Sequence, residues 1–151
     1  SHAQMRFIVV VEPSKEAFDA WVTSQLSPAS APEQELETQG RRVFGLKGCG
    51  VCHSVVIPEP EGIQATRMET FLSTGKDRFP APNLTHFASR ATFAAGILDN
   101  NTANLKRWLE SPDDVKPGNH MSALAGAYQN PDLALTKEDI SALIAYLENL
   151  K

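Results

Sequence analysis

Five consecutive residues, Cys49-Gly50-Val51-Cys52-His53, constrain this chain more than any other feature. Two thiols at this spacing can each add to one vinyl group of the same porphyrin. The histidine directly after the second cysteine then lies under the iron as its proximal ligand. The run therefore predicts one covalently attached c-type haem, held by Cys49, Cys52 and His53.

Two other kinds of site use a cysteine pair at this spacing. A thioredoxin-like redox pair follows a strand within a βαβ pattern, and the sequence around Cys49 shows neither. Half of a zinc site would need two more ligands at metal spacing, but the chain contains only 2 cysteines. Both readings are weaker than haem attachment, and a protein of either kind would be colourless.

An iron that carries electrons needs a sixth ligand, and four residues are candidates: Met68, Met121, His86 and His120. Met68 falls at helical spacing with two apolar neighbours, which favours core packing. His120 is adjacent to Met121, and adjacent side chains normally point apart. His86 is read as a structural or surface histidine. Met121 follows a stiff Lys-Pro-Gly turn and could equally be an ordinary buried methionine, so the residues alone leave this choice open.

Size and charge limit the other functions. The 151 residues suffice for one ordinary domain and a short appendage, and the net charge of −4 argues against nucleic-acid binding. The most prominent apolar run, residues 7–11, is far shorter than the roughly 20 residues of a membrane helix. No signal peptide is visible and the first residue is not Met, so we expect any export signal or anchor to lie upstream.

From Glu33 onward the pattern predicts helices and loops without a convincing strand, an all-α unit. Apolar residues recur at helical spacing in four segments, 33–45, 68–75, 102–110 and 136–150. The last is the clearest, because Thr136 and Asp139 resemble a capping box.

The first part of the chain has a different pattern. Residues 5–11 are β-branched and aromatic and predict a strand, and Ser14 then caps a short amphipathic helix. One strand and one helix cannot form a core, so residues 1–26 look like the end of a domain. The Pro/Ser/Ala stretch 27–32 has the composition of a linker, which leaves 33–151 as the second domain.

The second domain resembles class I cytochrome c over residues 33 to 151. The motifs occur in that family's order: Gly40-x-x-x-Phe44, the Cys-x-x-Cys-His run, Pro82-Asn83-Leu84, Trp108-Leu109-x-x-Pro112, Lys116-Pro117-Gly118-x-x-Met121 and Leu143-x-x-Tyr146. The resemblance implies the all-α class I cytochrome c fold, in which Gly40 lets the two terminal helices approach closely.

Four site residues follow from the resemblance. Met121 matches the distal axial ligand, and Pro82 matches the proline whose carbonyl accepts the proton of the proximal histidine. Arg90 matches an arginine that contacts a haem propionate. Trp108 stands where the family places an aromatic ring against the haem. The stretch between His53 and Pro82 is longer than in the compact mitochondrial type, so we expect the haem edge there to be covered differently.

The first residues resemble the end of the cupredoxin-like copper (CuA) domain of cytochrome oxidase subunit II. His2 and Met5 match the last two ligands of its binuclear copper site, followed by the strand and the aromatic helix. The bridging cysteines would lie upstream, so we expect these two residues to bind copper only in the intact subunit. Oxidases of the caa type carry a cytochrome c domain after this copper domain.

The two resemblances together imply an electron carrier within a caa-type oxidase, without a catalytic site of its own. It would accept electrons from a small redox donor protein and pass them to the CuA centre. Its other partners would be the remaining oxidase subunits, and its only membrane contact an upstream anchor. Its place would be the periplasm or the extracytoplasmic face of the cell membrane. The alternative is a free-standing periplasmic class I cytochrome c; a gas-binding haem sensor would need an open sixth position.

Overall fold

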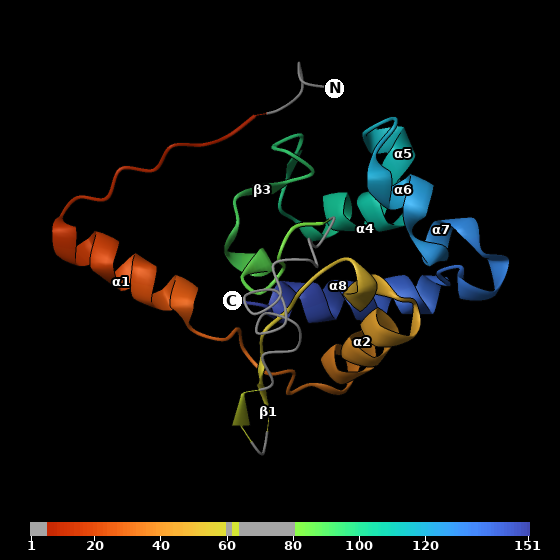
Figure 1. The fold of residues 1–151 in the computed structure, drawn as a ribbon, viewed down its shortest axis with the longest axis horizontal. Helices are drawn as coiled ribbons and strands as arrows, with labels where there is room; N and C mark the ends of the chain where they lie inside the picture. The colour runs from red at the N-terminus through yellow and green to blue at the C-terminus, as the bar shows by residue number, and fades with distance from the viewer. Residues whose placement is uncertain (1–5, 60–61, 64–80) are drawn as a thin grey trace, which may run out of the picture.

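The computed structural model describes residues 6–59, 62–63 and 81–151, and this part is mostly helical (Figure 1). The helices are α1 (Lys15–Leu26), α2 (Glu35–Leu46), α4 (Thr102–Glu110), α5 (Pro112–Val115), α6 (His120–Leu124), α7 (Gly126–Gln129) and α8 (Lys137–Asn149). Short 3-10 turns lie at Cys49–Val51 (η2), Phe87–Ser89 (η3) and Pro131–Leu133 (η4). In its described ranges the second domain is mostly helical, as the sequence predicts.

The two helices α2 and α8, both predicted from periodicity, cross each other and contribute buried side chains to the core. Gly40 is the crossing point, because a Cβ there would overlap the Ala142 carbonyl oxygen and lie 2.6 Å from the Tyr146 Cβ. Beside it, the Phe44 and Tyr146 rings meet edge-on with centroids 5.7 Å apart. The close approach predicted for Gly40 is confirmed.

Side-chain caps fix where the helices begin. Thr136 and Asp139 form the predicted capping box at the start of α8, each side chain accepting from the other's backbone N–H (3.1 and 2.9 Å). Asn101 caps α4 by accepting from Asn104 N–H (2.9 Å). These caps satisfy N–H groups that the first helical turn leaves without partners.

Two small antiparallel strand pairs were not predicted. β1 (Pro58–Glu59) pairs with β2 (Gly62–Ile63), and β3 (Thr92–Phe93) pairs with β4 (Leu98–Asp99). Strands of two residues are too short to show an alternating pattern. The turn between β3 and β4 contains three successive residues with positive φ, namely Ala94 (53°), Ala95 (64°) and Gly96 (75°).

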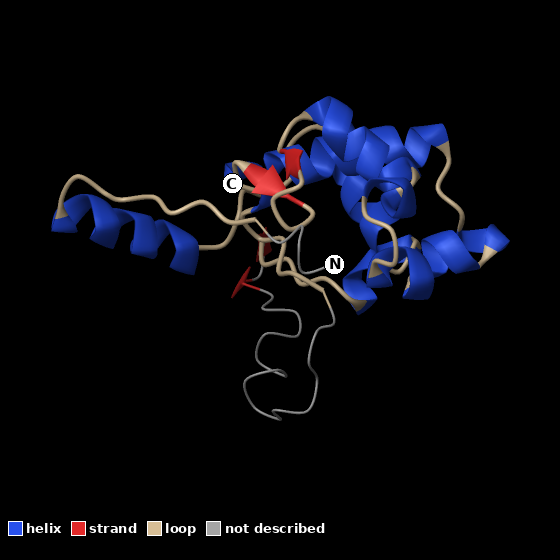
Figure 2. Cartoon of the chain, turned by 90° about the horizontal axis from the view of Figure 1, so that it is seen from above, coloured by secondary structure: helices blue, strands red, loops and turns tan. Residues whose placement is uncertain are grey.

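The N-terminal segment forms an arm, which we define as residues 6–26. It contains α1, capped by Ser14 as predicted. Residues 6–11 are extended, but the described residues offer them no strand to pair with, so the predicted strand is not found there as a paired strand. Figure 2 shows the arm standing away from the other helices.

The stretch predicted as a linker lies against the helical domain. Ala29 is 1% exposed, and its N–H donates to the Val56 carbonyl (2.9 Å). The Ser30 N–H donates to the Lys151 carbonyl (3.2 Å). These contacts join the base of the arm to the segment at Val56 and to the C-terminal residue that follows α8.

Several predictions fall outside the described residues. They are the helix around Met68 and the two residues matched to copper ligands, His2 and Met5. Within the described ranges, no helix combines the length and the apolar character needed to cross a bilayer.

Candidate haem-binding site

The Cys49–His53 run forms a tight turn directly after α2. Gly48 adopts a positive φ of 76° and turns the chain out of the helix. The N–H groups of Cys52 and His53 then both donate to the Cys49 carbonyl (3.2 and 2.9 Å). This turn holds two half-buried thiols and the histidine together on one short loop.

His53 is bonded to the loop that contains Pro82. Its Nδ1 lies 2.8 Å from the Pro82 carbonyl oxygen. A carbonyl can only accept, so Nδ1 carries the proton and Nε2 keeps its lone pair. Burial lowers the pKa of His53, the bond to Pro82 opposes this, and the Arg90 cation lowers it further. The imidazole is therefore held neutral, with Nε2 available to a metal.

The environment of Cys49 differs from that of a reactive dithiol. Burial raises the pKa of this thiol to about 11, so it stays protonated at neutral pH. Catalytic cysteine pairs of the thioredoxin type need a lowered pKa. Nor do any three His, Cys, Asp or Glu side chains of the described segments gather closely enough to hold a metal ion, as the zinc reading would require.

Met121 lies in the first turn of α6 and is half-buried against the core. Asn119, itself buried, caps this helix by accepting from Ser122 N–H (2.8 Å), and its amide donates to the Lys116 carbonyl (2.8 Å). Asp113 accepts from the Gly118 N–H (2.9 Å) and steadies the turn before the cap. This network could not be predicted from the sequence, because Asn119 is followed by His120 and not by an apolar periodic run.

Arg90 is half-buried and contacts the same loop that supplies Pro82. Its guanidinium donates to the Asn83 carbonyl and lies 5.9 Å from the centroid of the Phe87 ring. Burial lowers the pKa of Arg90, but an arginine remains charged at neutral pH. Asn100, which the sequence analysis did not identify, donates to the carbonyls of Phe87 (2.8 Å) and Arg90 (3.0 Å).

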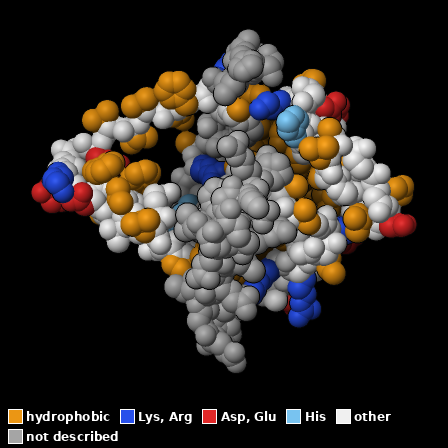
Figure 3. Space-filling view, viewed as in Figure 1, with side chains coloured by type: hydrophobic (Ala, Val, Ile, Leu, Met, Phe, Trp, Pro, Cys, Tyr) orange, Lys and Arg blue, Asp and Glu red, His pale blue; other side chains and the backbone are white. Residues whose placement is uncertain are grey.

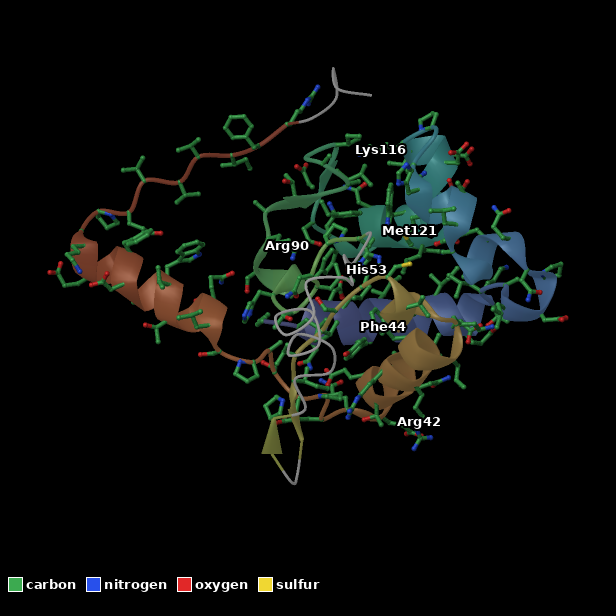
Figure 4. The ribbon with its side chains drawn as sticks, in the orientation of Figure 1. Arg42, Phe44, His53, Arg90, Lys116 and Met121 are labelled. Atoms are coloured by element: carbon green, nitrogen blue, oxygen red, sulfur yellow. The ribbon has the colours of Figure 1, made fainter. Side chains whose placement is uncertain are left out.

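The walls between these groups are apolar. Trp108 meets Phe93 edge-on with centroids 6.2 Å apart. Half-buried side chains that pack on the core here are Cys49, Leu84, Ile97, Trp108, Val115 and Met121. Figure 4 shows His53, Arg90 and Met121 coming from separate segments over the middle of the domain.

Tyr128 and His86 have polar atoms whose buried surroundings could not be predicted from the sequence. The Tyr128 hydroxyl donates to the Leu109 carbonyl (3.0 Å), and burial, with a contribution from Cys49, raises the pKa of Tyr128. His86 was expected to be structural or on the surface. Its Nε2 is buried, and no hydrogen-bond partner for it appears among the described residues.

These residues fit a c-type haem. Two thiols and a neutral imidazole lie on one turn, a thioether lies on another element, and a cation and aromatic rings come from further segments. Each is of the type that holds, ligates or covers a haem. Which residues bind it remains a prediction from the sequence.

Sequence comparisons with known proteins are consistent with a haem-binding site. The cytochrome c family model matches residues 37–151. Cytochrome c oxidase subunit 2 of Bacillus subtilis (strain 168) is 36% identical over 151 residues, which are 100% of this chain and 36% of that protein. The same subunit of Bacillus sp. (strain PS3) is 39% identical over 153 residues, again with 100% and 36% covered.

The chain thus spans about a third of the length of these curated relatives. The family model covers most of the chain, and a cytochrome c domain implies binding of haem c and a role in electron transport. The chain belongs to the cytochrome c family.

Proposed function

We propose that this chain holds one haem c covalently through Cys49 and Cys52 and works as a one-electron carrier. His53 and Met121 would be the axial ligands. The observation that carries this proposal is the bond from His53 Nδ1 to the Pro82 carbonyl, because it leaves Nε2 free of its proton on the turn that carries both thiols.

The bound haem would supply the one-electron couple, and the residues of the chain would adjust it. A methionine thioether favours reduced iron and raises the potential. The half-buried Arg90 cation acts in the same direction, because it disfavours additional positive charge nearby. The apolar walls, including Trp108, exclude water from the porphyrin. Since His53 and Met121 would fill both axial positions, little would rearrange when the electron moves.

We further propose that the chain is the C-terminal piece of subunit II of a caa-type oxidase. Residues 1–26 would be the end of a CuA domain, 27–32 a linker and 33–151 the cytochrome domain. The support is that relatives called cytochrome c oxidase subunit 2 match this chain along its whole length. A small redox protein would deliver the electron, which would go on to CuA, with His2 and Met5 as copper ligands only in the intact subunit.

This role would place the chain outside the cytoplasm, on the periplasmic or extracytoplasmic face of the cell membrane. The other partners would be the remaining oxidase subunits, and the membrane would be reached only through an upstream anchor. The sequence encoded upstream separates this role from a free-standing cytochrome c. An oxidase subunit requires the bridging cysteine ligands of copper in that upstream sequence. A stop codon or an unrelated domain there would exclude the oxidase role.

The haem proposal is tested by producing the chain in cells with a haem-attachment system and staining a denaturing gel for haem. We expect the stained band, and a mass increase of one haem, from the wild type. The double variant Cys49→Ser, Cys52→Ser should lose the stain because no thioether can form. An unstained wild-type protein would contradict covalent attachment.

A further inference from the structure

The arm, residues 6–26, has no core of its own. No residue of α1 is buried, and each side chain from Phe7 to Val11 is at least 60% exposed. Figure 3 shows hydrophobic side chains along the arm, at the left of the view. An isolated helix of this length is marginal in water. The position of the arm therefore depends on the contacts at its two ends.

The first contact joins Arg6 to the turn between β3 and β4. The Arg6 N–H donates to the Ala95 carbonyl (3.0 Å). Gly96 lies so close that a Cβ added there would be 2.8 Å from both the Cβ and the carbonyl oxygen of Arg6. Ala94 and Ala95 hold positive φ angles of 53° and 64°, a region that is unfavourable for residues with a Cβ atom. The turn thus keeps an unfavourable shape where the arm passes.

This turn is continuous with the wall of the haem site. Phe93, directly before it, is buried and packs against Phe87 (centroids 5.6 Å apart) and edge-on against Trp108 (6.2 Å). Protein interiors compress little, so a displacement of this turn would also displace the aromatic rings packed against Phe93. The contact at Arg6 is therefore made with a turn that is anchored to the core of the cytochrome domain through Phe93.

The second contact is at the base of the arm. The N–H groups of Ala29 and Ser30 donate to the carbonyls of Val56 and Lys151 (2.9 and 3.2 Å). The Asn149 side-chain amide donates to two carbonyls of the same segment (3.3 and 3.0 Å). Ala29 is buried among core residues. The segment predicted as a linker is thus bound to the domain at several atoms.

We propose that these two contacts form a docking surface that fixes the arm, and the upstream domain to which it belongs, on the cytochrome domain. The arm and its base occupy this surface through Arg6, Ala29 and Ser30, and the exposed apolar side chains of the arm would be covered by the sheet of the domain that precedes residue 6 in the full-length protein. The two domains then keep one relative position instead of swinging on residues 27–32. This inference rests on the proposed function, in which the upstream domain carries the copper site.

Hydrogen exchange of the haem-loaded chain tests the contacts directly. We expect protection at the Arg6, Ala29 and Ser30 amides in the wild type. Gly96→Ala should speed exchange at Arg6 roughly tenfold and leave the other two unchanged, since it displaces Arg6 alone. Asn149→Ala should speed exchange at Ala29 and Ser30 instead.

Gly118→Ala is the matched control for the glycine variant. Gly118 has a φ of 74°, against 75° at Gly96, but no atom lies near its Cβ position. Both variants therefore strain the backbone alike, and only Gly96→Ala disturbs the arm. Equal exchange at Arg6 in the two variants, or a wild-type Arg6 amide that exchanges as in an unfolded peptide, would overturn the proposal.

Electron transfer in the full-length subunit supplies the second test. In a fixed pair of domains, the rate from haem to copper should not change with solvent viscosity. The double variant Gly96→Ala, Asn149→Ala should lose this fast phase and show a slower one that depends on viscosity. A wild-type rate that falls with viscosity would overturn the docking. A full-length subunit that binds no copper would contradict the proposed function. It would not affect the docking proposal, because the hydrogen-exchange experiment tests the contacts of the arm independently.

Discussion

At the scale of single residues, the site depends on which side-chain atoms remain free to bind a metal. The Pro82 carbonyl binds the Nδ1 proton of His53 and leaves Nε2 as a donor to metal. The motif predicted His53, and the resemblance predicted its bond to Pro82. The supports of Met121 were not predicted, because Asp113 and Asn119 act through turn geometry that appears only in the folded chain.

Met121→Ala tests the ligand assignment. The variant should keep its haem attached, because the thiols are unchanged, but should bind CO when reduced, whereas the wild type should not. The matched variant Met68→Ala should leave the CO-insensitive spectrum unchanged. Visible spectra of the reduced proteins with and without CO measure this, and CO binding by the Met68 variant alone would show that the assignment is wrong.

Arg90→Gln tests the electrostatic role of the half-buried Arg90 guanidinium. Removing a cation near the haem should lower the midpoint potential by about 40 mV, which corresponds to about 1 kcal/mol for one electron. Arg42→Gln is the control, because Arg42 is exposed on α2 and its charge is screened by solvent. Redox titration of both variants decides the point, and equal shifts would contradict a specific role for Arg90.

At the scale of elements, helix ends and one helix crossing organise the domain. The caps of α1, α4 and α8 were predictable because each shows a capping side chain before an apolar periodic run. The β3–β4 turn was not, because alanine gives no signal for positive φ. The crossing of α2 and α8 is the element contact most open to a test.

Gly40→Ala should destabilise the haem-loaded protein by about 1 to 3 kcal/mol, because its Cβ would overlap the Ala142 carbonyl. Gly45→Ala, in the same helix, has no atom within 4 Å of its Cβ position. It should be neutral or stabilise by up to about 1 kcal/mol through helix propensity. Guanidinium unfolding gives both values, and equal effects would exclude close packing at Gly40.

The ion pair between Lys47 and Asp139 should make stability depend on pH. Their charged atoms are 3.0 Å apart, and both side chains are only 17% exposed. Burial alone would raise the pKa of Asp139, but the hydrogen bonds from Thr136 and the bond and charge of Lys47 together lower it. The contribution of Asp139 is therefore present above its unfolded pKa and is lost as pH falls through the folded pKa.

Lys47→Met should accordingly lower the free energy of unfolding at pH 7 by about 1 kcal/mol, a difference that shrinks below about pH 4. The exposed pair of Lys15 and Asp19 supplies the control, because Lys15→Met should change little at either pH. Urea unfolding across this pH range measures both. A loss that did not depend on pH would show that Lys47 acts through packing and not through charge.

At the scale of the whole molecule, the sequence indicated a cytochrome domain preceded by a different segment. The helical domain was predictable because its motifs and apolar periodicity agree. How the arm lies was not, because composition described residues 27–32 as a linker while Ala29 is buried by contacts distant in sequence.

As proposed here, the folded chain is a one-electron carrier in which both axial positions of the iron are filled. Spectroelectrochemical titration of the haem-loaded chain, repeated under CO, tests it most directly. We expect one reversible one-electron wave with a low-spin c-type spectrum, unchanged by CO. A protein without haem, or a wave and spectrum that shift under CO, would contradict it.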